Sequence, residues 1–108
     1  MTDMSIILCD EENENVQVKV RAEIVHGYLE ISGHDFGLAV ENLFETDDYE
    51  YFYRFDRANT ERLLALLSDG ETSVENTLLS RFSGMDGCKA LREFCDANEI
   101  KYQFYSYP

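Results

Sequence analysis

VQVKVRAEIV, residues 16–25, alternates apolar and polar side chains strictly from Val16 to Ile24. The apolar members, Val16, Val18, Val20, Ala22 and Ile24, share one face, because successive side chains of a β-strand point to opposite sides. His26-Gly27 then offers a tight turn into a second apolar-alternating segment, Tyr28–Ser32. The sequence therefore predicts a β-hairpin formed by these two segments.

Upstream of this hairpin lies a short apolar run, Ser5–Cys9, followed by the acidic segment Asp10–Asn15. The run is typical of a strand, and the acidic segment is expected to be the loop that returns the chain to the hairpin. Together the three segments predict an antiparallel meander.

Downstream of the hairpin, Asp35 is placed to cap a helix. Apolar side chains then recur at the three- and four-residue spacings of an amphipathic helix, at Phe36, Ala39, Val40, Leu43 and Phe44. The segment Tyr49–Phe55 that follows is rich in aromatic residues on both faces, which favours a strand that is central in the sheet or covered on both sides.

The rest of the chain is mainly helical in pattern. We expect helices from Asp56 to Ser68, from a capping box at Thr72–Glu75 to Gly84, and from Asp86 to Asn98, then a last strand at Ile100–Tyr107. The prediction is a single α+β domain over residues 1–108: a two-layer sandwich with an antiparallel or mixed sheet of about 4–5 strands and about 4 helices largely on one side.

Charge narrows the range of partners. The net charge is −13, and residues 1–56 carry 14 acidic and 3 basic residues, whereas residues 57–108 carry 8 and 6. An anionic membrane or a nucleic acid would repel such a domain, so direct binding to either is not expected. A basic protein is the expected kind of partner.

The cysteines and the amino terminus indicate a compartment. Cys9, Cys88 and Cys95 are an odd and sparse set, and no secretory signal or apolar run of membrane-spanning length is present. We therefore expect reduced thiols and a cytoplasmic location.

The sequence matches no motif for catalysis, phosphate binding or metal binding well. We therefore predict no catalytic residue, no metal ligand and no cofactor. The glycine-containing segments 33–37 and 83–87 lack the spacing and the lysine of a phosphate loop. Cys88 and Cys95 are seven residues apart on a helix, too far along its axis to share a zinc ion. The acidic runs lack the glycine spacing of a calcium loop. A Cys88 nucleophile served by His34 and Asp35 is conceivable, but no spacing in the sequence brings the three together.

Acidic and aromatic residues gather on neighbouring segments between residues 45 and 56. Tyrosine combines a large apolar ring with a polar tip and is enriched at protein interfaces, although rim tyrosines also occur in ordinary helix-covered sheets. The candidate partner-binding residues are Glu45, Asp47, Asp48, Tyr49, Glu50, Tyr51 and Tyr53.

Three hypotheses follow. The first is a small bacterial-type interaction module that docks a basic partner, as an immunity protein, a decoy or a regulatory subunit does. The second is a small enzyme or ligand-binding domain with a pocket at His34 and Asp35. The third is a structural homodimer whose tyrosine-rich terminal strand extends the sheet of a second copy.

Overall fold

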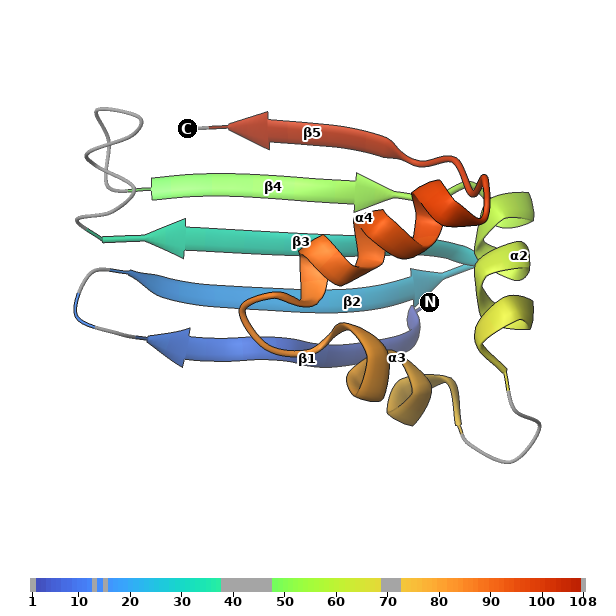
Figure 1. Cartoon of the computed structure of the whole chain (residues 1–108), viewed down its shortest axis with the longest axis horizontal. Helices are drawn as coiled ribbons and strands as arrows, with labels where there is room; N and C mark the ends of the chain where they lie inside the picture. The colour runs from blue at the N-terminus through green and yellow to red at the C-terminus, as the bar shows by residue number, and fades with distance from the viewer. Residues whose placement is uncertain (1, 13, 15, 38–47, 69–72, 108) are drawn as a thin grey trace.

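The computed structural model describes residues 2–12, 14, 16–37, 48–68 and 73–107. They form a five-stranded antiparallel sheet and three helices, with the strands side by side in chain order, β1-β2-β3-β4-β5 (Figure 1). The elements are β1 Thr2–Glu12, β2 Gln17–Val25, β3 Tyr28–Phe36, β4 Asp48–Arg54, α2 Arg57–Leu67, α3 Val74–Phe82, α4 Gly87–Ala97 and β5 Gln103–Tyr107. The α+β class and the antiparallel sheet are confirmed. The described residues hold three helices rather than about four.

The helices lie on one side of the sheet and at one of its ends. Figure 1 shows α4 crossing the sheet obliquely, α3 beside β1, and α2 at the end where β2 finishes. We call the face under α4 the helix face and the opposite one the open face. The described part of the chain contains no helix long and apolar enough to cross a membrane.

The β2–β3 hairpin forms as the alternation predicts. Its turn residues His26 and Gly27 both have positive φ, 53° and 84°, as the tight hairpin turn that matches strand twist requires. On the helix face of β2, Val18, Val20, Ala22 and Ile24 are all buried. The predicted meander of β1, β2 and β3 is thus confirmed.

Strands β1 and β3 are longer than predicted, for a common reason. Asp10, Glu11 and Glu12 continue β1 because they stand opposite Lys19, Val18 and Gln17 of β2, so they are not loop residues. Asp35 and Phe36 likewise belong to β3 and not to a helix start, because β2 and β4 both pair with them. Ladder pairing on both sides outweighs the local helical spacing. Gly37 forms a bend and not a helical turn, and the remainder of the expected helix, residues 38–44, lies outside the described residues.

Strand β4 is central, between β3 and β5, and it is covered on one face only. Tyr51 and Tyr53 of β4, with Phe55 just after it, are buried on the helix face, whereas Glu50 and Arg54 are exposed on the open face. The core between sheet and helices is completed by Leu8, Leu29, Ile31, Leu63, Leu78, Phe82, Leu91, Cys95 and Ile100.

The helix boundaries follow their caps. Asp56, where α2 was expected to begin, accepts the Asn59 N–H, and α3 is capped by Ser73, which accepts the Asn76 N–H, one residue after the start of the predicted capping box. The last strand starts at Gln103, three residues after the predicted Ile100. The reason is that the Ile100 N–H bonds to the Cys95 carbonyl, which keeps this segment folded against α4.

Candidate functional site

One end of the sheet collects acidic side chains from three strands. In three successive rows of the sheet, strand pairing aligns Glu12 with Gln17, Phe36 and Asp48, then Glu11 with Val18, Asp35 and Tyr49, then Asp10 with Lys19, His34, Glu50 and Tyr107. We call this set of three rows the acidic end. It is where β1, β3 and β5 finish and β4 begins, on the left of Figure 1.

The acidic end is accessible to solvent. Asp10, Glu11, Glu12 and Glu50 are exposed, and Asp35 is half-buried. Lys19 is the one lysine or arginine that the three rows contain among the described side chains, and His34 stands next to it in the same row. The register of the sheet therefore brings acids from distant parts of the chain to one end of it: Asp10, Glu12 and Glu50 lie on the open face, whereas Glu11 and Asp35 of the middle row point to the helix face.

The predicted partner-binding residues divide into three groups. Glu50 and Tyr49 belong to the acidic end, and Asp48 is placed there by its backbone pairing. Tyr51 and Tyr53 are buried, the latter with only 2 % of its surface exposed, so neither ring is available to a partner on the surface. Glu45 and Asp47 lie outside the described residues.

An aromatic residue of the acidic end that the sequence did not assign to the site is Tyr107. Its ring is 59 % exposed, stands in the same row as Glu50 and lies 6.0 Å from the ring of Phe52. Tyr105 and Tyr107 are two residues apart and therefore share one face of the terminal strand. This spacing was the signal that could have indicated an aromatic surface beside β4.

His34 and Asp35 are not brought together. As neighbours in a strand they point to opposite faces. His34 lines an open-face hollow of about 280 Å³ with Ile7, Arg21, Ser32 and Phe52 among its neighbours. Asp35 faces the helices. A single pocket containing both side chains is therefore absent from the described structure.

Asp35 belongs instead to a hollow beside α4, which we call the α4 cavity. It measures about 370 Å³ and is lined by Asp35, Tyr49, Tyr51, Tyr53, Met85, Asp86, Cys88, Lys89, Arg92 and Phe104. The Tyr51 hydroxyl donates to Oδ1 of Asp35 at 2.9 Å, and Nη1 of Arg92 donates to the Tyr53 oxygen at 2.6 Å. The two buried tyrosines thus present their polar tips to this cavity, next to a carboxylate and a guanidinium.

Ionisation in the α4 cavity is governed by burial. Desolvation raises the pKa of Asp35 above its usual value, although the Tyr51 hydrogen bond opposes that shift. Burial also raises the pKa of the Cys88 thiol to about 11, against a smaller lowering effect of Arg92. Cys88 is therefore protonated at neutral pH, which is the reverse of what an activated nucleophile needs.

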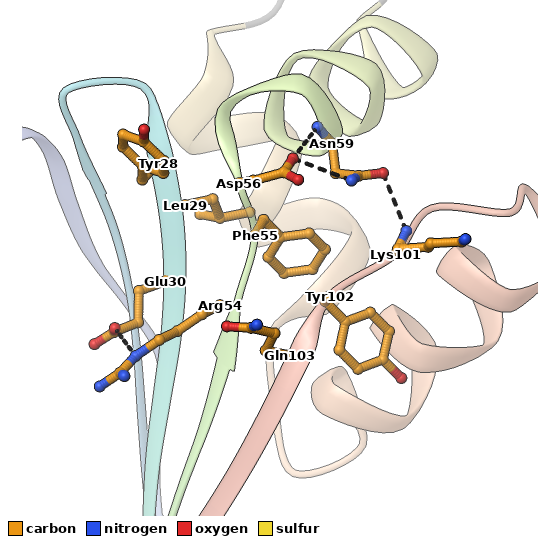
Figure 2. Close-up of a pocket in the computed structure, with 10 residues that line it drawn as sticks. All are labelled: Tyr28, Leu29, Glu30, Arg54, Phe55, Asp56, Asn59, Lys101, Tyr102 and Gln103. Carbon is orange, nitrogen blue, oxygen red and sulfur yellow. Dashed lines mark hydrogen bonds and ion pairs between the residues drawn. The ribbon is translucent and has the colours of Figure 1, made fainter.

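A further hollow of about 390 Å³ lies at the opposite end of the sheet, where β4 and β5 diverge (Figure 2). Arg54 forms an ion pair with Glu30 there, at 2.6 Å between Nε and Oε2. Asn59 connects the start of α2 with the segment that leads into β5. Its backbone and side-chain N–H groups both donate to Asp56, and its side-chain oxygen accepts the backbone N–H of Lys101. Because these polar groups are paired with one another, we interpret this hollow as a structural junction and not as a binding site.

Within the part of the chain that the structure describes, no three His, Cys, Asp or Glu side chains are close enough to hold a metal ion. All three cysteines are free thiols. No protein-family model, no curated protein and no solved structure matches this chain.

Proposed function

We propose that this domain is an interaction module that docks a basic partner protein through the acidic end of its sheet. The observation that carries the proposal is the alignment of Asp10, Glu11, Glu12, Asp35, Asp48 and Glu50 in three successive rows. A concentrated field of one sign raises the rate at which an oppositely charged protein finds its orientation.

The proposed surface also has apolar anchors, which a steering field alone would lack. Tyr107 is the exposed ring of the acidic end, and the half-buried Phe52 lies next to it. Aromatic side chains that become desolvated at the centre of an interface supply most of its binding energy. Tyr107 and Phe52 therefore replace Tyr51 and Tyr53 as the rings expected to contact the partner. We assign this activity to the cytoplasm of a bacterial-type host, as an immunity, decoy or regulatory function.

The test compares two variants of equal net charge. One reverses three exposed acids of the acidic end, Asp10, Glu12 and Glu50, to lysine. The control reverses three exposed helix acids, Glu61, Glu75 and Glu93, to lysine. Basic proteins captured from the native host by the wild-type chain are purified, and their association rates with each variant are measured over a range of salt concentrations.

The acidic-end variant should associate at least about tenfold more slowly than wild type and lose most of its salt dependence, because steering depends on local charge. The control variant should stay close to wild type. Equal slowing of both variants would show that net charge alone matters, and equal rates for all three proteins would refute docking at the acidic end. Circular dichroism of each variant checks that the fold is kept.

A small-ligand pocket in the α4 cavity is the second candidate function. It is favoured by the half-buried Asp35, because its raised pKa and its place in the same cavity as Arg92 are features of binding sites. Screening a fragment library by NMR would test it: fragments should shift signals of α4 and β4, and Arg92→Met should abolish those shifts. A screen without any such hit would remove this candidate.

A further inference from the structure

The last strand, β5, is an edge of the sheet that the described structure leaves unprotected. Every residue of Gln103–Tyr107 is exposed, and the strand contains no charged residue, no glycine and no proline. It carries three aromatic rings: Phe104 is 49 % exposed, Tyr105 37 % and Tyr107 59 %. Because one side of an edge strand has unpaired backbone groups, such a strand is a ready template for another strand.

The opposite edge, β1, has the protections that β5 lacks. Its pairing with β2 has register shifts between Thr2 and Met4 and between Ile7 and Cys9, and it ends in Asp10, Glu11 and Glu12. The Leu8 carbonyl is already occupied, since it accepts the N–H of Gly84 from the turn between α3 and α4. Irregular pairing, charges and covering segments are the means by which natural sheets prevent edge association. The contrast singles out β5 as the edge left open for pairing.

We propose that β5 pairs antiparallel with β5 of a second copy of this chain, joining two five-stranded sheets into one. A two-fold axis passing beside Tyr105 would place Tyr105 opposite its counterpart, and Gln103 opposite Tyr107 of the second copy. Tyr105 faces the open side, where the two Tyr105 rings would meet, and Phe104 faces the helix side, where it would lie opposite Ser106 and diagonal to Phe104 of the second copy.

For two copies that each carry −13, charge favours the antiparallel over the parallel direction of pairing. Tyr107 shares a row with Glu50, and Gln103 shares a row with Arg54. Antiparallel pairing therefore continues the Glu50 row of one copy into the Arg54 row of the other. It also holds the two acidic ends at opposite ends of the joint sheet, whereas parallel pairing would bring them together.

Dimerisation and partner docking both involve Tyr107, but they are distinguished by different substitutions and different measurements: docking is tested at Asp10, Glu12 and Glu50, and dimerisation at Tyr105. Sedimentation velocity from low micromolar to several hundred micromolar concentration should show the wild-type chain shifting from monomer to dimer. Tyr105→Lys should weaken dimerisation at least about tenfold, because it sets like charges directly opposite each other. Tyr105→Thr is the matched control, since it removes the ring, keeps strand propensity and adds no charge, and it should still dimerise.

Cysteine cross-linking tests the register. Under mild oxidation Tyr105→Cys should give a disulfide-linked dimer, whereas Tyr107→Cys should not, because residue 107 is opposite residue 103 and distant from its own counterpart. A chain that stays monomeric throughout would overturn the proposal, including the case in which β5 pairs with a strand of another protein. Dimers that survive Tyr105→Lys, or that cross-link through residue 107 and not 105, would overturn it as well. Thermal unfolding of each variant confirms that a loss of dimer is not a loss of fold.

Discussion

The ring of Tyr51 covers Gly33 on the neighbouring strand so closely that a β-carbon at residue 33 would come within 2.0 Å of it. The two residues are directly opposite in the β3–β4 ladder, and both are buried on the helix face. The glycine makes room for the ring, and the position of the ring in turn brings the Tyr51 hydroxyl to Asp35. One small residue thus sets the geometry of one wall of the α4 cavity.

Gly33→Ala should destabilise the domain by about 1–3 kcal/mol, because an added methyl group must displace a packed aromatic ring. Denaturant unfolding monitored by circular dichroism measures this free energy. Ser32→Ala is the control, because Ser32 is the preceding residue of β3 and its side chain lies on the open face. This substitution should change the free energy of unfolding by less than about 0.5 kcal/mol. Equal effects of the two substitutions would show that Tyr51 can move away freely.

Asp35 should make folding stability depend on pH in an unusual direction for a carboxylate. Its pKa is raised in the folded state, so the folded chain holds this proton more tightly than the unfolded chain does. The contribution of Asp35 is then most favourable below its unfolded pKa and is lost as the pH rises through the folded pKa.

Asp35→Asn isolates this effect, because the amide oxygen still accepts the Tyr51 hydrogen bond but does not titrate. The unfolding free energy of wild type minus that of the variant should fall as the pH rises from 3 towards neutrality and then become constant. A difference that rises with pH would mean that the Tyr51 hydrogen bond, and not burial, dominates the ionisation of Asp35.

The thiols should react slowly in the folded protein. Burial raises the pKa of Cys9, Cys88 and Cys95 to about 11 in each case. Because alkylation needs the thiolate, the folded chain should react with iodoacetamide at pH 7.5 roughly a hundredfold more slowly than the unfolded chain. Mass spectrometry of time points locates the label. Rapid labelling of half-buried Cys88 at this pH would show that its thiol is not protonated as expected, and it would support a catalytic role for the α4 cavity.

Most of the fold was predictable because its elements carry local signals. The alternation of β2, the His26-Gly27 turn, the start of a helix at Asp56 and the helix end at Asn98 each depend on residues close in sequence. The misplaced end of β3 had the opposite cause. The residues from Asp35 onward fit a helix by spacing, and only the pairing of Asp35 with Val18 and Tyr49 keeps it in the sheet.

The site was less predictable than the fold, since its geometry depends on long-range register. Tyr51 and Tyr53 share a face with Phe55, and that apolar neighbour was a signal that their face is the covered one. The alternation of a strand likewise implies that His34 and Asp35 diverge, once β3 is extended to include them. No local pattern, by contrast, indicated that Arg92 of α4 would reach the Tyr53 hydroxyl.

The three helices that the structure describes between β4 and β5 have a consequence for the order of folding. The first four strands follow one another closely in the chain, but β5 reaches β4 only after residues 55–102 have been placed. Closing that connection costs entropy that short hairpins do not incur, so we expect β5 to join the sheet late. During synthesis the aromatic strand β4 is therefore the temporary edge of the nascent sheet. Strand β5 then covers this edge and becomes the new edge of the sheet itself.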